Sequence, residues 1–477
     1  MAWRNGAKTR SRAGGWGRAA RLSAAVTVVS VGMAGVGVAR AGTVSSQTLP
    51  QLVVGTGQGH PQLVVRVTGS GFAPRTVVSV RFDKVRVASA RTGPGGRFQT
   101  WLKVPAQAQP GRHIVAANPN TGKTVRVPFV VRTNWVMDNF DARRTGVNPW
   151  ENTLSAANVS QATVQWTAAF QGLTDYTSAV TDDGMVFAAA ENFDAPGHDT
   201  LIAYNANTGA QIWATGIGTE SDAPVVTGGL VYACNGDQLN VLDEATGALQ
   251  WLQNGVCSPG MIYSDGVLYF GTAVGMGAFD IATRQVLWNE TVPGGVGGWA
   301  LANGTLYLSS GQEIQAYDAS NGQLIWSTPV ANVAEGFPSV ADGMVFAGDD
   351  GNDFYALDAT TGAIVWHQTV VNPSKAPAVV NDGTVYIDGS DGVSALSATS
   401  GQIVWQDTTL GGGPEESAGA LANGVLYMPT HGAISALDAA TGDILWQGGS
   451  DSSSVVVTNG NLYAATSQGL TDFAVSN

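Results

Sequence analysis

Acidic side chains recur at one place in a series of sequence repeats, seven to nine residues ahead of a turn Gly. They are Asp175, Glu220, Asp222, Glu335, Glu415, Glu416 and Asp451. If the repeats fold alike, these carboxylates gather as an acidic collar at one end of the structure. Ca²⁺ takes about six to eight oxygen ligands, often carboxylates, so the collar is a candidate calcium site. The alternative is that Asp, Asn and Gly stand there because they form turns.

Two further residues are placed where they could contact a ligand. Lys375 is the one basic side chain at the collar positions. Trp299 follows four glycines in the stretch GGVGGW, and glycine lets another group approach the backbone closely. Trp299 is therefore either a stacking platform for a flat cofactor or a plug that fills the axis of the fold. We assign Trp299 and Lys375 as candidate cofactor-binding residues.

The two cysteines, Cys234 and Cys257, are not adjacent in the sequence. In an exported chain they predict one disulfide, here between neighbouring repeats. Catalytic constellations are otherwise missing from the sequence. The five His have no metal-ligand spacing, and there is neither a G-x-S-x-G nucleophile motif nor a phosphate-binding Gly loop. Catalytic residues are therefore left unassigned.

An eleven-residue frame positions all of these residues. It reads ALDATTGAIVW at residues 356–366, and its closing Trp recurs at spacings of 37 to 41 residues. The closing residues are Trp213, Trp251, Trp288, Trp326, Trp366, Trp405 and Trp446. A period near forty made of short β runs is typical of propeller blades. Since one ligand site does not need seven copies, we expect each Trp to pack between blades.

The turn glycines count eight repeats, but the last repeat reaches the end of the chain before a fourth strand. The stretch ATVQWTAAF at residues 162–170 can supply that strand, with Trp166 in place of the missing Trp. We therefore predict an all-β fold in which residues 162–477 form an eight-bladed β-propeller. Pairing of residues 162–170 with the C-terminal strands closes the ring and removes the open sheet edge.

The distribution of charge divides the chain into domains. Residues 42–133 hold twelve Lys or Arg and one acid, Asp83, whereas residues 134–477 hold four basic and thirty-five acidic residues. Short β runs between Gly and Pro turns predict a small basic β-sandwich at 42–133, followed by a linker at 134–161. The acidic part disfavours nucleic acid as a partner. The basic sandwich suits an anionic cell-wall polymer, a lipid surface or its own acidic neighbour.

The first 41 residues have the order of a secretory signal. A basic stretch precedes the apolar run LSAAVTVVSVGMAGVGVA and the small-residue site ARA. We expect cleavage after Ala41, no transmembrane segment afterwards, and a secreted or cell-surface protein. An uncleaved anchor is the alternative, because the run is long enough to span a bilayer.

The frame A-x-D-x-x-T-G-x-x-x-W resembles the tryptophan-docking motif of the pyrroloquinoline-quinone (PQQ)-type propellers, over roughly residues 135–477. That family includes quinoprotein alcohol dehydrogenases and a lipoprotein that assists outer-membrane protein assembly. The chain departs from the motif at Asn205, Val241, Arg284 and Ser397. Residues 50–132, which contain the sequences GSGFAP and GPGGRF, resemble the immunoglobulin-like modules of exported bacterial proteins.

The resemblance implies two different functions. The dehydrogenases surround their quinone with a disulfide of adjacent Cys, a Trp floor and a calcium set, and this chain has no adjacent Cys pair. We therefore expect a monomeric binding or scaffold protein, without enzymatic activity, that holds a protein or a cell-envelope polymer through an acidic channel face. The alternative is a PQQ- and calcium-dependent dehydrogenase of alcohols or sugars. A propeller that binds or cleaves glycans is a third reading.

Overall fold

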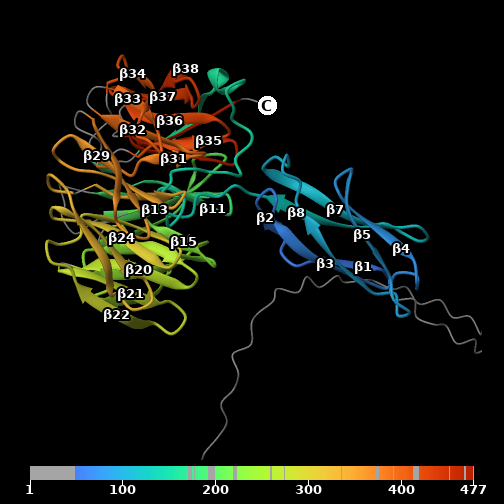
Figure 1. Cartoon of the computed structure of the whole chain (residues 1–477). Coiled ribbons are helices and arrows are strands. Elements are labelled where there is room, and N and C mark those ends of the chain that lie inside the picture. The colour runs from blue at the N-terminus through green and yellow to red at the C-terminus, as the bar shows by residue number, and fades with distance from the viewer. Residues whose placement is uncertain are drawn as a thin grey trace, which may run out of the picture. The chain divides into compact units, whose positions relative to one another are not determined.

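The computed structural model describes residues 49–169, 175–176, 178–191, 199–218, 223–257, 260–272, 274–334, 336–370, 375–389, 392–411, 418–450, 452–466 and 469–475. This part of the chain consists of strands, with one short 3-10 helix, η1 (Val159–Gln161) (Figure 1). The predicted signal sequence lies outside the described residues. None of the described helices has the length and apolarity needed to cross a membrane.

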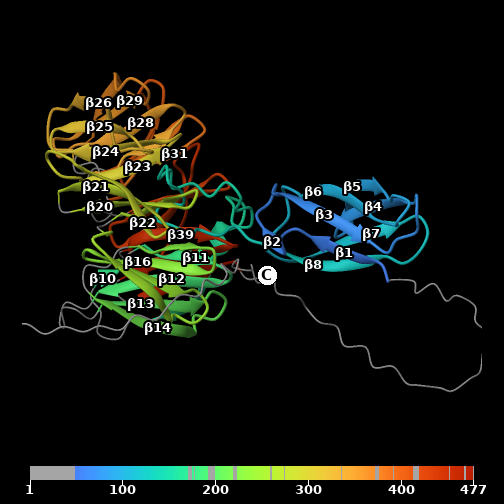
Figure 2. The same cartoon turned by 90° about the horizontal axis from the view of Figure 1, so that it is seen from below.

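The basic N-terminal domain is a sandwich of two sheets, coloured blue in Figures 1 and 2. In sheet order the first contains β1 (Gln51–Val54), β3 (Val64–Ser70) and β6 (Phe98–Lys103), and the second β2 (Gln58–Gly59), β8 (Val125–Val131), β7 (Gly111–Pro119), β4 (Val77–Phe82) and β5 (Val85–Arg91). Burial alternates along β3, where Val65 and Val67 face inward and Val64 and Arg66 face solvent. The inward side chains of both sheets form one apolar core. The immunoglobulin-like assignment of this sandwich stays a prediction.

Eight antiparallel sheets follow within the described residues, seven with four strands and the first with five, and each is called a blade below. Blades 1 to 4 contain β11 (Val180–Asp182), β12 (Met185–Glu191), β13 (Asp199–Asn205) and β14 (Gln211–Gly218); β15 (Val225–Thr227), β16 (Leu230–Asn235), β17 (Gln238–Asp243) and β18 (Leu249–Asn254); β19 (Ile262–Ser264), β20 (Val267–Thr272), β21 (Gly275–Asp280) and β22 (Gln285–Thr291); and β23 (Gly298–Ala302), β24 (Thr305–Ser310), β25 (Glu313–Asp318) and β26 (Leu324–Pro329). Strand β10 (Asp175–Tyr176) also pairs with β12. The chain in this part is all-β, as predicted.

Blades 5 to 8 repeat the same order. They contain β27 (Ser339–Ala341), β28 (Met344–Gly348), β29 (Asp353–Asp358) and β30 (Ile364–Thr369); β31 (Val379–Asn381), β32 (Thr384–Gly389), β33 (Gly392–Ser397) and β34 (Ile403–Asp407); β35 (Ala420–Ala422), β36 (Val425–Thr430), β37 (Ala433–Asp438) and β38 (Ile444–Gly448); and β39 (Ser452–Thr458), β40 (Asn461–Thr466), β41 (Gly469–Ala474) and β9 (Thr163–Ala168). First strands are buried, whereas fourth strands expose about every second side chain. The first strand is therefore the inner strand of its blade.

Strand β9 joins the two ends of the ring. It pairs antiparallel with β41, from Ala168 opposite Leu470 to Thr163 opposite Ala474. The fourth strand of the last blade thus comes from a segment that precedes the first blade, which is the closure that Trp166 predicts. No blade is left with an unpaired third strand, so this edge cannot template aggregation.

The frame Trp residues dock each blade on the next. Their indole N–H groups donate to backbone carbonyl oxygens at 2.8–3.2 Å, namely Trp166 to Ala206, Trp213 to Glu244, Trp288 to Ala319, Trp326 to Ala359, Trp366 to Ala398, Trp405 to Ala439 and Trp446 to Ala162. The frame Gly packs on the ring, since a Cβ at Gly362 would lie 2.6 Å from Trp326. Where Arg284 replaces this Gly, its guanidinium covers Trp251 at 4.6 Å instead. The frame is therefore a structural part.

Both kinds of tight turn in a blade lie at the same end of the propeller, called the turn end below. The hairpin between the first and second strands carries Asp-Gly, Asn-Gly or, in blade 2, Gly-Gly. Residues such as Asp265 and Gly266 adopt the positive φ that this hairpin requires. The frame turn joins the third and fourth strands. Because successive strands are antiparallel, the two turns meet at one end.

Candidate binding cleft beside the channel segment

Residues 133–148 run along the inner strands without forming a helix or strand of their own, and they are called the channel segment below. Its carbonyl oxygens accept backbone N–H groups from six blades at 2.6–3.0 Å, from Thr181 to Trp135, Val226 to Val136, Leu301 to Ala142, Val340 to Arg143, Val380 to Thr145 and Leu421 to Gly146. Every donor stands three residues ahead of the hairpin Gly. Inner strands otherwise present an unpaired edge to the axis, and the channel segment pairs that edge.

The remaining two blades are treated differently. Blade 8 is held by side chains, because Thr458 Oγ1 donates to the Thr133 carbonyl at 2.8 Å and Asn148 Nδ2 donates to the Val457 carbonyl at 2.9 Å. In blade 3 the equivalent residue is Tyr263. Within the described ranges its N–H makes no hydrogen bond to the channel segment. Within the described residues, β19 is therefore the one first strand without a hydrogen bond to the channel segment, and it pairs only with β20.

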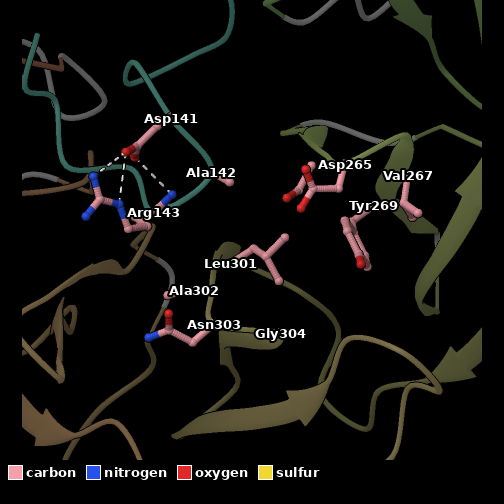
Figure 3. A pocket seen from close by; sticks show the side chains of 11 residues that line it. Asp141, Ala142, Arg143, Asp265, Val267, Tyr269, Leu301, Ala302, Asn303 and Gly304 are labelled. Atoms are coloured by element: carbon pink, nitrogen blue, oxygen red, sulfur yellow. Dashed lines mark hydrogen bonds and ion pairs between the residues drawn. The ribbon is translucent and has the colours of Figure 1, made fainter. Parts of the chain in front are cut away.

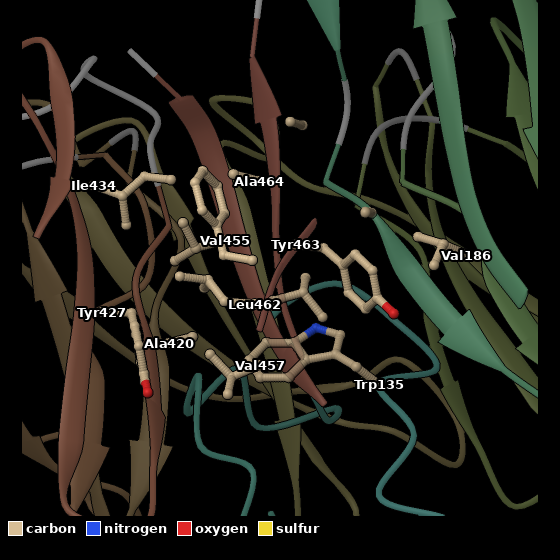
Figure 4. Close-up of a cluster of buried hydrophobic side chains, with 14 of the residues drawn as sticks. Trp135, Val186, Ala420, Tyr427, Ile434, Val455, Val457, Leu462, Tyr463 and Ala464 are labelled. Atoms are coloured by element: carbon tan, nitrogen blue, oxygen red, sulfur yellow. The ribbon is translucent and has the colours of Figure 1, made fainter. Parts of the chain in front are cut away.

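Trp135 anchors the start of the channel segment in the propeller core. It is 2% exposed and packs among buried side chains of blades 1, 7 and 8. Figure 4 shows its ring near Val457 and Tyr463 of blade 8, with Val186 of blade 1 farther away. The channel segment is thus part of the fold rather than a free linker.

Arg144 reaches blade 3 from the channel segment. Its Nη2 donates to the Gly260 carbonyl at 3.0 Å, and its Nη1 pairs with Asp138 Oδ2 at 2.7 Å. The guanidinium also lies 4.6 Å from the centre of the Phe337 ring. Arg144 is 1% exposed, and Asp138 supplies the partner that a buried charge requires.

Trp299 lies in β23 and is 1% exposed. Its Nε1 donates to the same Gly260 carbonyl that Arg144 contacts. A Cβ added at Gly260 would lie 3.1–3.2 Å from Arg144, Phe337 and Trp299, so these groups fill the space around the ring. A stacked quinone needs an open ring face, and the residues here do not fit one. The packing corresponds to a plug and does not support Trp299 as a cofactor ligand.

The predicted collar lies almost entirely outside the described residues. Glu220, Asp222, Glu335, Glu415, Glu416 and Asp451 are not described, and Asp175 is placed by its backbone alone, in β10. Lys375 is described, and its carbonyl accepts the Phe337 N–H at 2.9 Å. In the part of the chain that the structure covers, no three His, Cys, Asp or Glu side chains are grouped to hold a metal. Calcium binding at the collar stays a prediction.

The two cysteines form a disulfide. Cys234 lies in β16 of blade 2, and Cys257 lies between β18 and β19, on the connection to blade 3. Their Cα atoms are 5.5 Å apart, and both side chains are buried in a core that spans the two blades. The bond therefore ties blade 2 to the connection into blade 3, whose first strand has no hydrogen bond to the channel segment among the described residues.

A cleft of about 410 Å³ opens at the turn end between blades 3 and 4 (Figure 3). Three groups of residues line it: Asp141, Ala142 and Arg143 of the channel segment, Ser264, Asp265, Val267 and Tyr269 of blade 3, and Leu301, Ala302, Asn303 and Gly304 of blade 4. The cleft lies where the channel segment has left strand β19. Its volume is in the range of sites that take a small molecule or a large side chain.

The walls of the cleft combine charge with an apolar floor. Arg143 Nε and Nη2 both donate to Asp141 Oδ2, at 2.9 and 2.6 Å. In Figure 3 Leu301 lies between this pair and Asp265 with Tyr269. Burial, and then the charges of Asp265 and Asp318, raise the pKa of Tyr269, which keeps its hydroxyl neutral at physiological pH. Asp265 is exposed at the hairpin tip, so the cleft offers a carboxylate beside apolar surface.

Acidic side chains are distributed around the turn end. They comprise Asp183, Asp265, Asp342 and Asp382 at the first hairpins and Asp243, Asp280, Asp318, Asp358 and Asp438 at the frame turns. Hydrogen bonds from turn residues lower the pKa of Asp280, Asp318 and Asp358 and so keep them ionised. Within the described residues, the turn end is therefore an acidic face.

Sequence reasoning missed both the channel segment and the cleft. The stretch NWVMDNFDARRTGVNPW has no periodicity, so it was predicted to be a linker. One signal was available, because every inner strand of a propeller needs acceptors for its inward N–H groups. No such signal marks the cleft, which depends on where the segment departs from a strand.

Comparisons with known proteins identify relatives at the level of the fold. The sequence pattern of the family described as outer membrane protein assembly factor BamB matches residues 142–273, 257–328 and 310–476. No curated protein sequence matches the chain. BamB from Moraxella catarrhalis is 18% identical over 65% of this chain and 99% of its own, with a TM-score of 0.52.

Two other solved structures share the architecture. Quinohemoprotein alcohol dehydrogenase from Comamonas testosteroni is 16% identical over 72% of this chain and 80% of its own, with a TM-score of 0.58. A computationally designed protein, Ika8, is 17% identical over 65% of this chain and 100% of its own, with a TM-score of 0.54. An assembly factor, an oxidoreductase and a designed protein share only the fold, so the site has to decide the function.

Proposed function

This chain belongs to the PQQ-like propeller family described as outer membrane protein assembly factor BamB, and we propose that it is an exported or cell-surface scaffold protein without enzymatic activity. It binds a partner protein at the acidic turn end. The cleft beside the channel segment carries the proposal, because it joins a carboxylate, a hydroxyl and apolar side chains at one accessible place. These groups suit a basic or amphipathic side chain presented by a partner.

Charge complementarity selects the partner. Residues 134–477 hold thirty-five acidic and four basic residues, and one of the four, Arg144, is buried against Asp138. A field of one sign steers an oppositely charged partner toward the surface and weakens as salt is added. The partner segment is therefore basic, and its affinity falls with ionic strength.

The N-terminal sequence supports the cellular location. Its basic stretch, apolar run and ARA site have the order of a secretory signal, and the disulfide suits an oxidising compartment. We propose that the chain works outside the cytoplasm, where a cell-envelope protein presents the basic segment.

Site-specific photo-cross-linking in the producing cells tests the proposal. A photoreactive residue at position 303 replaces Asn303, which lines the cleft, and should give a discrete adduct with one envelope protein. Asp265→Lys should abolish that adduct. Asp382→Lys is the matched control, because Asp382 occupies the same hairpin position in blade 6. The two residues have nearly equal φ values, 47° for Asp382 and 48° for Asp265. Absence of an adduct, or its equal loss in both variants, would overturn the proposal.

A second assay tests for oxidoreductase activity. The purified chain is incubated with PQQ and Ca²⁺, desalted, and tested for retained quinone absorbance and dye-linked oxidation of alcohols and sugars. We expect no retained chromophore. Stoichiometric retention together with turnover would assign the chain to the dehydrogenases instead.

A further inference from the structure

One face of the N-terminal sandwich displays an exposed Trp among cationic and hydrogen-bonding side chains. On the sheet β1-β3-β6, Trp101 is 59% exposed and stands directly opposite Arg66. Lys103 lies two residues farther along β6, and Gln99 two residues back. The same face carries Val53, Val64, Thr68, Ser70 and Gln51 from β1 and β3. It is called the Trp101 face below.

We propose that the Trp101 face binds an acidic polysaccharide, with a sugar ring stacked on Trp101 and carboxylates held by Arg66 and Lys103. The face lies on a different domain from the propeller cleft, so it adds a second binding function to the proposed scaffold. The strands in question appear in Figure 2, where β3 and β6 run side by side.

The spacing of Arg66, Trp101 and Lys103 on the sheet suits one extended ligand. Side chains at alternate residues of a strand stand about 7 Å apart, and neighbouring strands about 5 Å apart. Lys103 and Gln99 therefore flank Trp101 at about 7 Å on either side, while Arg66 stands across from the ring. Arg66 Nη2 donates to Gln99 Oε1 at 2.8 Å, which fixes the guanidinium beside the ring. An extended polymer of rings can contact all of them at once.

The charge of the domain selects an anionic ligand. Residues 42–133 hold twelve basic residues and one acid. That acid, Asp83, is paired with His113 Nδ1 at 2.7 Å and belongs to the turn between β4 and β5 of the other sheet. The Trp101 face therefore has no carboxylate of its own to repel an acidic polymer.

The distribution of apolar groups favours a polysaccharide over a bilayer. Membrane-surface binding needs a continuous apolar area that enters the headgroup region. On the Trp101 face, Arg66 pairs with Trp101 and Lys103 pairs with Val64, while Thr68 lies between Gln99 and Val53. Polar or charged side chains therefore interrupt the apolar ones. Trp101 lies within β6, an edge strand of this sheet, rather than on a protruding loop. An aromatic ring framed by amides, a hydroxyl and cations matches a sugar, which has both C–H faces and hydroxyl groups.

Binding of the full mature chain to polygalacturonate tests the proposal, with dextran and phosphatidylglycerol vesicles as the other probes. We expect binding to polygalacturonate, little to dextran, and at least a tenfold loss of affinity in Trp101→Ala. Arg66→Ala/Lys103→Ala should weaken the affinity and reduce its dependence on salt. Arg86→Ala/Arg126→Ala is the matched control, since it removes the same charge from exposed positions of the other sheet.

Each outcome is decisive. Binding that depends on Trp101 and Arg66 but survives the control variant supports the proposal. Equal losses in the two double variants would show only non-specific charge attraction and overturn it. Binding to vesicles that requires Trp101 would replace the polysaccharide by a lipid surface. Failure here leaves the propeller cleft unaffected, because the photo-cross-link at position 303 reports a different domain. Circular dichroism and thermal melting confirm that each variant is folded.

Discussion

Asn148 Nδ2 donates to the carbonyl oxygen of Thr133 at 2.7 Å and so joins the two ends of the channel segment. The same nitrogen donates to Val457 in blade 8, and Asn148 Oδ1 accepts the N–H groups of Trp150 and Glu151. Asn148 is fully buried. One side chain thus completes the ring of contacts that the channel segment makes with the blades.

Replacing Asn148 should cost the propeller much of its stability. Asn148→Ala leaves buried carbonyl and N–H groups without partners, at about 1–3 kcal/mol for each group that water cannot reach. We expect the free energy of unfolding to fall by about 2–4 kcal/mol in chemical denaturation. Asn321→Ala, on an exposed frame turn, should change it by less than about 0.5 kcal/mol. Similar values for the two variants would contradict a closing role for Asn148.

Two alanine substitutions can separate the stability that comes from Trp packing on glycine from the cost of backbone strain. Gly362 and Gly343 have nearly equal positive φ values, 73° and 77°. A Cβ at Gly362 meets the Trp326 ring at 2.6 Å, whereas a Cβ at Gly343 has nothing within 4 Å. Gly343→Ala should cost about 1 kcal/mol from φ strain alone, and Gly362→Ala about 2–4 kcal/mol because the ring must also move. Equal melting temperatures would refute the docking role.

The closing blade carries a buried acid where the other blades have Ala or Val. Asp472 pairs with Trp166 as Ala356 pairs with Trp366; it is 2% exposed, and its Oδ1 has no hydrogen-bond partner in the described structure. Burial raises its pKa to about 7. The unfolded chain loses this proton near pH 4, so stability falls as pH rises from about 4 to 7 and is constant above, by about 4 kcal/mol in all.

Asp472→Ala should therefore stabilise the protein in a pH-dependent way. We expect the variant to unfold at a higher denaturant concentration than the parent chain at pH 8, with the difference shrinking toward pH 4, where Asp472 is protonated in both states. A stability difference that is the same at pH 4 and pH 8 would mean that folding does not raise the pKa of Asp472.

The disulfide should stabilise the junction of blades 2 and 3. It closes a sequence separation of 23 residues, for which the chain-entropy estimate is about 3 kcal/mol. Cys234→Ala/Cys257→Ala should lower the free energy of unfolding by about that amount, and reduction should lower the parent chain to the level of the variant. Peptide mapping without reductant checks the bond directly, and two free thiols would remove the prediction's basis.

Periodic features could be predicted from the sequence, and the single-copy features could not. Repeated Trp and Gly residues place the blades, and Trp166 places the closing strand, because each blade repeats one local solution. The channel segment occurs once and pairs with strands of three to five residues spread over the chain, so no local pattern reports it. Trp299 was placed on the correct inner strand, but its environment depends on Arg144 and Phe337, which lie far from it in sequence.

Ring closure also sets when this protein can fold. The contact of Asn148 with Val457 spans 309 residues, and β9 pairs with the last strand of the chain. Contacts this distant in sequence are slow to form, because a long loop must be ordered before they stabilise anything. Asn148 and β9 are therefore made long before their partners Val457 and β41. Until those strands are synthesised, the partly folded propeller has to stay soluble with an open ring.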